Sequence, residues 1–221
     1  MDRTEIRKYC AEALGTFILT FIGAGAVMAN AFGSGMGIAG PALAFGFAAC
    51  IAICMFGAIS GAHINPAVTA GFFILKKIEA ADALRYITAQ IVGATAAGLA
   101  LAWTLGSLVP IGNAVTALRN TLHPVQGILI EALLTFFLMS AVLGSGKERG
   151  QKPIHTGAIV GMVIAMDILA GGIFTGGSMN PARSFGPAIV AGIWKDQWVY
   201  WVGPILGASL GAWASKFWHG K

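Results

Sequence analysis

Charged residues are scarce in this sequence: Asp, Glu, Lys and Arg make up 10% of its 221 residues, whereas about 25% is usual in soluble domains. Apolar residues reach 57%, so the charged side chains are too few to cover a water-soluble surface. Cysteine is scarce too, and the three cysteines have neither the spacing of a zinc site nor that of a disulfide framework. Because the sequence also lacks a Ser/His/Asp set, a metal-ligand cluster and a phosphate-binding loop, it predicts no enzyme, no cofactor and no metal site.

Long apolar segments are what the sequence does contain. A window of about 20 residues, the length that a helix needs to cross a bilayer, fits six segments: 9–30, 41–59, 83–105, 124–143, 154–173 and 199–218. We therefore predict an all-α membrane protein with a single transmembrane domain over residues 1–221.

Basic residues gather on one side of this topology. Six crossings place both termini on the same side of the membrane, and eleven of the fourteen Lys and Arg residues fall on that side: Arg3, Arg7, Lys8, Lys76, Lys77, Arg85, Lys147, Arg149, Lys152, Lys216 and Lys221. Cytoplasmic loops carry an excess of Lys and Arg, so both termini are predicted to be cytoplasmic. The net charge of +5 then reflects membrane topology, and we expect no nucleic-acid partner.

Two pairs of segments repeat along the chain. Residues 130–136 match residues 11–17 with Glu131 in the place of Glu12, and residues 176–182 match residues 61–67. The offsets of 119 and 115 residues are nearly equal. Each half contains three crossings, so the halves enter the membrane from opposite sides and form an inverted repeat. We expect halves of about 1–105 and 124–221, linked by 106–123.

Each half carries Asn-Pro-Ala after its second span. Asparagine is a favoured N-cap and proline fits the first helical turn, so the motif predicts half-helices at 66–75 and 181–193 that re-enter the membrane. The residues before each cap are then non-helical at membrane depth, which is tolerated where such backbone lines a water-filled cavity. We expect pore-lining carbonyls from Gly61, Ala62, His63, Gly176 and Ser178.

The two capping asparagines, Asn65 and Asn180, are predicted to meet at the centre of this pore. If each side-chain oxygen caps its helix, each NH2 group faces the lumen as a donor. A water molecule held by two donors turns its hydrogens outward and cannot pass a proton along a chain of waters. The two helix N-termini add partial positive charge at the same point, which disfavours cations.

The residues resemble the aquaporin (major intrinsic protein) family over essentially the whole chain. The similarity rests on Ser60–Thr69 (SGAHINPAVT) and Gly177–Pro187 (GSMNPARSFGP), and the second half looks most like archaeal aquaporins and the plant tonoplast-intrinsic branch. The resemblance implies six transmembrane helices with two re-entrant half-helices. It also implies a homotetramer with one pore in each subunit.

The same resemblance implies a selectivity filter made of Phe45, Ile168, Gly177 and Arg183. The strictest water channels of the family carry histidine where this chain has Ile168, and Gly177 adds no side chain. Glycerol facilitators typically carry tryptophan where this chain has Phe45. We therefore expect a passive channel for water and small uncharged solutes such as glycerol or ammonia, with protons and ions excluded.

Acidic residues inside the spans need partners, because a charge in the bilayer is costly. We expect Glu12 and Glu131 to accept hydrogen bonds from the backbone of the two re-entrant loops, as the family resemblance also implies. Asp167 is expected to face a loop or another subunit, near Arg119.

Inverted repeats and broken helices also occur in secondary transporters, which form the alternative class. The absence of an acidic residue beside the two asparagines weighs against that alternative. We expect the plasma membrane as the location, with a vacuolar membrane as the alternative.

Overall fold

The computed structural model describes residues 2–146 and 151–219, and each regular element within them is a helix. The helices are α1 (Arg3–Phe32), α2 (Ala39–Phe56), α3 (Pro66–Ile74), α4 (Ala80–Leu105), the short 3-10 helix η1 (Ile111–Ala114), α5 (Pro124–Ser145), α6 (Pro153–Thr175), α7 (Pro181–Ala191) and α8 (Val199–His219). The predicted all-α class is confirmed. Lys147, Arg149 and Lys221, which entered the topology prediction, lie outside the described residues.

The predicted ends of the spans differ from the observed ends by a few residues. Helix α1 begins at Arg3 instead of residue 9, because Asp2 forms a capping box. The Asp2 carboxylate accepts from the backbone of Thr4 and Glu5 at 2.7 and 2.8 Å, while Glu5 accepts from the Asp2 amide at 3.1 Å. This cap extends the helix into a polar segment that an apolar window does not detect.

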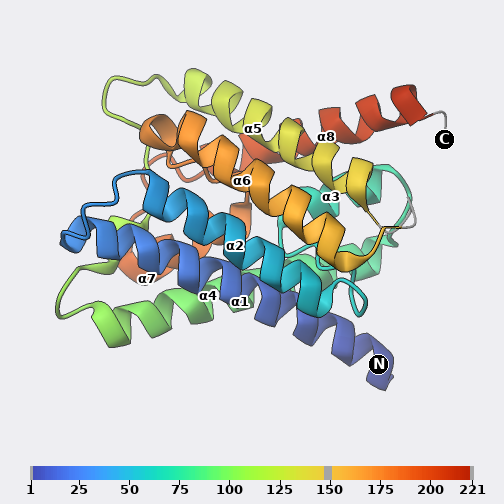
Figure 1. Ribbon diagram of the computed structural model, residues 1–221, viewed down its shortest axis with the longest axis horizontal. Helices are drawn as coiled ribbons and strands as arrows, with labels where there is room; N and C mark the ends of the chain where they lie inside the picture. The colour runs from blue at the N-terminus through green and yellow to red at the C-terminus, as the bar shows by residue number, and fades with distance from the viewer. Residues whose placement is uncertain (1, 147–150, 220–221) are drawn as a thin grey trace.

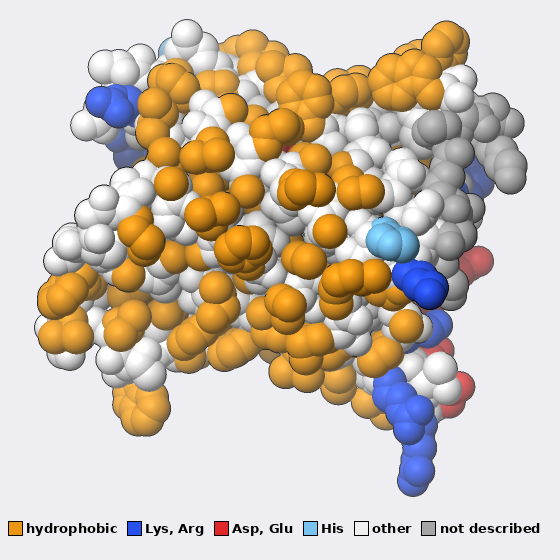
Figure 2. All heavy atoms as spheres, viewed as in Figure 1, with side chains coloured by type: hydrophobic (Ala, Val, Ile, Leu, Met, Phe, Trp, Pro, Cys, Tyr) orange, Lys and Arg blue, Asp and Glu red, His pale blue; other side chains and the backbone are white. Residues whose placement is uncertain are grey.

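Five of the described helices are long and apolar enough to cross a membrane: α1, α2, α4, α5 and α6. Helix α8 has 21 residues and is therefore about 31 Å long, which also matches the apolar thickness of a bilayer. Figure 2 shows hydrophobic side chains over most of the visible surface, whereas the acidic side chains visible on this face lie mostly at one end.

The six long helices surround the two half-helices. Helix α1 packs against α2 and α4, and α5 packs against α6 and α8, so the two halves repeat the same arrangement. Figure 1 shows α3 and α7 toward opposite ends of the bundle, with both termini at the end that holds α3. The half-helices contact each other, and their lengths of about 14 and 17 Å together equal one span.

Two glycines allow the tightest helix crossings. A Cβ atom at Gly93 in α4 would lie 2.1 Å from the carbonyl oxygen of Ala13 in α1. A Cβ atom at Gly207 in α8 would lie 2.1 Å from the carbonyl oxygen of Ala132 in α5. Any larger residue would push these helices apart, so each half depends on one equivalent close contact, between α1 and α4 in the first half and between α5 and α8 in the second.

Candidate functional site

Both predicted asparagine caps are present at the starts of the half-helices. The Asn65 side-chain oxygen accepts from the Ala67 amide at 2.8 Å. The Asn180 oxygen accepts from the amides of Ala182 and Arg183 at 3.0 and 3.2 Å. Asn65 and Asn180 are 4% and 3% exposed, so both caps lie in the interior at the point where the half-helices meet.

The amide nitrogens of these asparagines cross between the two halves of the chain. Asn65 Nδ2 donates to the Met179 carbonyl at 2.8 Å, and Asn180 Nδ2 donates to the Ile64 carbonyl at 2.9 Å. The sequence analysis expected the NH2 groups to face the lumen only. Because a primary amide carries two hydrogens, each asparagine keeps one donor beyond the bond to the opposite loop.

The two loops that precede the caps have an unusual backbone. Ala62, Ile64 and Met179 have positive φ angles of 49°, 46° and 54°. Such angles are rare for residues with a side chain, especially β-branched ones, and are maintained only where surrounding contacts hold them. Strained backbone of this kind clusters at functional sites, so the loops are the centre of the candidate site.

Glu12 and Glu131 supply the contacts that hold the loops. The Glu12 carboxylate accepts from the amides of His63 and Ile64 at 2.9 and 2.6 Å, and from the Gln90 side chain at 2.8 Å. Both glutamates are fully buried. The first predicted loop contact is therefore present in the structure.

The second half repeats this arrangement. The Glu131 carboxylate accepts from the amides of Ser178 and Met179 at 2.9 and 2.7 Å, and from the Thr175 hydroxyl at 2.7 Å. Gln90 has no equivalent there, because the position 114 residues later is Pro204. The first loop thus has one more side-chain donor on its glutamate than the second.

Two cavities share part of their wall. The inner cavity, about 60 Å³, is lined by both asparagines and by the loop residues 61–64 and 177–179. The outer cavity, about 140 Å³, is lined by residues 114–116, Gly176 and the facing ends of α1, α2 and α6. Three residues line both cavities: Phe45, Ile168 and Arg183. These three residues therefore lie at the boundary between the two cavities.

The fourth predicted filter residue, Gly177, lines the inner cavity beside Ile168. Its φ angle is +54°, and a Cβ atom there would lie 3.2 Å from the Cα of Ile168. A side chain at this position would be strained and would narrow the passage. Gly61, Ala62, His63 and Ser178 also line the inner cavity, whereas Gly176 lines the outer one.

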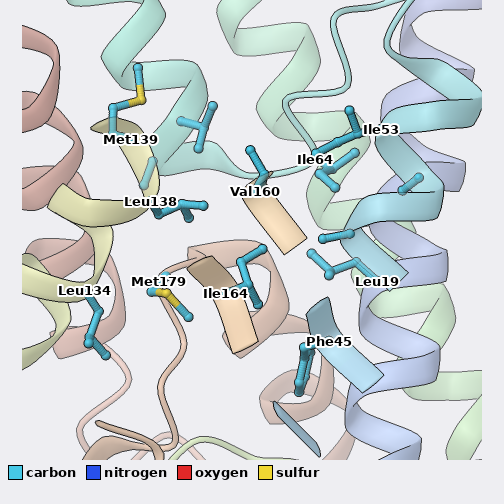
Figure 3. Close-up of a cluster of buried hydrophobic side chains, with 14 of the residues drawn as sticks. Leu19, Phe45, Ile53, Ile64, Leu134, Leu138, Met139, Val160, Ile164 and Met179 are labelled. Carbon is cyan, nitrogen blue, oxygen red and sulfur yellow. The ribbon is translucent and has the colours of Figure 1, made fainter. Parts of the chain in front are cut away.

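Most of the inner cavity wall is apolar. Figure 3 shows Leu19, Ile164 and Met179 directed from different elements toward a common space. His63, the one histidine among the lining residues, stacks on the Phe72 ring with centroids 4.4 Å apart. The polar residues of the wall are those of the two loops, the two asparagines, Thr156 and Arg183. Outside the two loops, the apolar residues of this wall are Leu19, Phe45, Ala49, Ile53, Val68, Phe72, Leu138, Val142, Val160, Ile164 and Ile168.

Comparisons with known proteins agree with this geometry. The family model described as major intrinsic protein matches residues 2–215. The chain belongs to the major intrinsic protein family. It is 41% identical to Aquaporin TIP4-4 of Zea mays over 95% of this chain and 85% of that protein. It is 40% identical to Glycerol uptake facilitator protein-like 6 of Lactiplantibacillus plantarum, over 96% and 97% of the two chains.

A solved structure shares the fold. The aquaglyceroporin from Plasmodium falciparum superimposes with a TM-score of 0.89 and 25% sequence identity, covering 98% of both chains. Aquaporin TIP2-1 of Arabidopsis thaliana is 37% identical over 93% of this chain and 84% of its own. The predicted fold and the resemblance to the plant tonoplast-intrinsic branch are therefore confirmed.

Several polar residues of this major intrinsic protein were missed by the sequence analysis. Thr116 donates from its hydroxyl to Ser184 at 2.9 Å, and its carbonyl accepts from Gln197 at 3.0 Å. These contacts hold residues 114–116 over the outer cavity beside Arg183. Loop residues with no repeat partner and no motif gave no signal in the sequence.

The placement of Asp167 corrects one expectation. Its side chain is 1% exposed within the subunit, and its Oδ2 atom has no hydrogen-bond partner. The expectation that it faces another subunit is therefore wrong. Asp167 lies one helical turn before Gly171, which packs against Leu134 of α5, so the acid is on the side of α6 that meets α5.

Proposed function

We propose that this membrane protein is a passive channel for water and small uncharged solutes, with one pore along the line of the two cavities. The observation that carries the proposal is that Phe45, Ile168 and Arg183 line both cavities, so a single constriction separates them. Relatives named as aquaporins and as a glycerol uptake facilitator support water and glycerol as the solutes.

The constriction selects solutes through size and polarity. Arg183 presents its buried guanidinium, whose Nη1 atom has no protein partner, and can donate a hydrogen bond to a passing oxygen. Phe45 and Ile168 form apolar walls, and Gly177 leaves room because it has no side chain. We propose that this filter passes water and admits glycerol, since no polar group replaces Ile168.

The centre of the pore blocks protons and cations. Asn65 and Asn180 each keep one N–H beyond the bond to the opposite loop, and a water molecule between them accepts both. Its hydrogens then point away from the centre, so it cannot accept a proton from a neighbour. The N-termini of α3 and α7 add positive potential at this point.

We further propose one channel domain over residues 1–221, a homotetramer with a pore in each subunit, and cytoplasmic termini in the plasma membrane. Both termini lie at the same end of the bundle in Figure 1, and the lysine and arginine residues in the first two turns of α1 and in the segment before α4 belong to that end. Mass measurement of the detergent-solubilised protein tests the tetramer, and protease access to tagged termini in oriented vesicles tests the topology.

Stopped-flow light scattering on proteoliposomes tests the proposed function. Proteoliposomes that contain the wild-type protein should shrink faster under osmotic stress than empty liposomes, and they should take up measurable glycerol. Val160→Phe places a ring in the inner cavity and should abolish both fluxes. Met162→Phe, on the exposed side of the same helix, is the matched control and should conduct like wild type. A correctly inserted wild-type protein that moves neither solute would overturn the proposal.

A further inference from the structure

Two tyrosines make equivalent hydrogen bonds in the two halves. The Tyr86 hydroxyl donates to the Ser60 carbonyl at 2.8 Å, and the Tyr200 hydroxyl donates to the Thr175 carbonyl at 2.7 Å. The tyrosines are 5% and 0% exposed. They are 114 residues apart, close to the 115 residues that separate the two pore asparagines, so they occupy equivalent positions in the repeat.

The carbonyls of Ser60 and Thr175 need these donors because the helical donor has been diverted. In a continuing α-helix, each carbonyl accepts from the amide four residues later. Those amides belong to Ile64 and Met179, and they donate to Glu12 and Glu131 instead. A buried carbonyl without a partner is costly, and the tyrosine hydroxyls provide the missing bond.

Ser60 and Thr175 are therefore held from two sides. Their side-chain hydroxyls donate to Glu12 and Glu131, both at 2.7 Å, while their carbonyls accept from the tyrosines. Thr175 is the last residue of α6, and Ser60 is the last residue of the turn that follows α2, so each stands directly before a pore-lining loop. Because both the hydroxyl and the carbonyl of each residue are held, the direction in which the following loop begins is fixed.

The two loops lead to different parts of the pore. Thr175 is followed by Gly176, which lines the outer cavity, and by Gly177 beside Ile168 at the constriction. Ser60 is followed by residues 61–63, which line only the inner cavity. The Tyr86 ring also meets the inner-cavity residue His63 edge-on, with centroids 5.2 Å apart.

We propose that Tyr86 and Tyr200 are positioning residues with divided roles: Tyr200 sets the solute selectivity of the filter, whereas Tyr86 sets the overall rate at which water and glycerol pass, without changing their ratio. The inference rests on the proposed function, because it assumes that the two loops line a conducting pore. Neither tyrosine lines either cavity, so each acts through the loop that it holds.

Tyr200→Phe and Tyr86→Phe test the inference, because each removes only the hydroxyl. Tyr9→Phe is the control, because it keeps the ring that meets Tyr86 edge-on, with centroids 5.9 Å apart, and removes only a hydroxyl that donates to Asp82 at 2.8 Å. Water and glycerol permeability are measured for each variant in proteoliposomes of equal protein content. Tyr200→Phe should raise the glycerol-to-water permeability ratio by about two- to tenfold, which is the fold-change that corresponds to the free energy of one lost hydrogen bond.

Tyr86→Phe should lower water permeability while the glycerol-to-water ratio stays at the wild-type value, and Tyr9→Phe should change neither. A general loss of stability would lower both fluxes together and leave the ratio unchanged, so for Tyr200 the ratio separates positioning from mere support. For Tyr86, circular dichroism of the same proteoliposomes makes the distinction, because a positioning role lowers both fluxes while the helix content stays at the wild-type value. An unchanged ratio in Tyr200→Phe, or an equal rise in Tyr86→Phe, overturns the inference. If Tyr200→Phe does not fold, the glycerol-to-water ratio of Tyr86→Phe still tests the role proposed for Tyr86. Wild-type protein that conducts no water would instead mean that the proposed function has failed.

Discussion

The guanidinium carbon of Arg183 lies 4.5 Å from the centroid of the Phe45 ring. The two residues come from α7 and α2, which lie in different halves of the chain, and both line the inner and outer cavities. A cation–π contact stabilises a buried guanidinium by about 2 kcal/mol, and it needs no carboxylate partner. The constriction can therefore keep its positive charge while leaving hydrogen-bond donors for a solute.

Replacing Arg183 by valine should widen the constriction and remove its charge. Glycerol permeability should rise about tenfold, which corresponds to a barrier lower by about 1.4 kcal/mol. Arg183→Lys keeps the charge but loses the planar donor group, so its glycerol permeability should lie between that of Arg183→Val and that of wild type. Solute uptake by stopped-flow scattering measures the change, and equal glycerol permeability in all three proteins would contradict the assignment of this residue.

Ile168→His should make the filter narrower and more polar. The new ring takes the place of an apolar wall that lines both cavities, so glycerol permeability should fall severalfold while water still passes. Ile164→His is the matched control, because Ile164 lies one helical turn away and lines only the inner cavity. Its glycerol-to-water ratio should stay near that of wild type. If both histidine variants change the ratio equally, the constriction is not at Ile168.

Asn65→Asp should weaken proton exclusion. The aspartate can still cap α3 through one oxygen, but it cannot donate to the Met179 carbonyl or to water, and it brings negative charge to the pore centre. We expect a proton leak together with a loss of about 1–3 kcal/mol of stability. A pH-sensitive dye inside proteoliposomes measures the leak. Asn120→Asp on an exposed turn is the control, and a leak of the same size there would argue against a special role for Asn65.

Glu131→Gln should loosen the second loop. Glu131 accepts three hydrogen bonds through both carboxylate oxygens, and a glutamine would turn an NH2 group toward one of those donors. The mismatch should cost about 1–3 kcal/mol and lower Tm by several degrees in a detergent unfolding assay. Glu79→Gln is the control, because Glu79 is exposed and its side chain makes no cap bond to α4. Equal Tm values would mean that the loop does not depend on Glu131.

Much of this fold could be predicted from the sequence because its signals are local. Each span is a continuous apolar segment, and each half-helix begins with an asparagine and a proline that act within one turn. The repeat then related the halves, and the resemblance to the aquaporin family pointed to Phe45, Ile168 and Arg183, which the structure brings together.

What the sequence analysis missed depends on contacts between distant residues. The bond from Asn65 to Met179 spans 114 residues, and nothing near either residue marks it. Tyr86 and Tyr200 sit at the repeat offset, so a comparison of the halves extended to α4 and α8 would have found them. Asp167 was misplaced because a helical angle alone does not identify the neighbour that packs against it.

The crossed asparagine bonds also constrain how the protein is made. Because the Ile64 carbonyl finds its donor in Asn180, the first half cannot complete its own loop while the ribosome is still adding the second. Early in synthesis, the first three spans must hold a polar, unfinished loop inside the membrane. The two halves mature together in one late step, so separately expressed halves should be unstable alone and rescue each other when both are present.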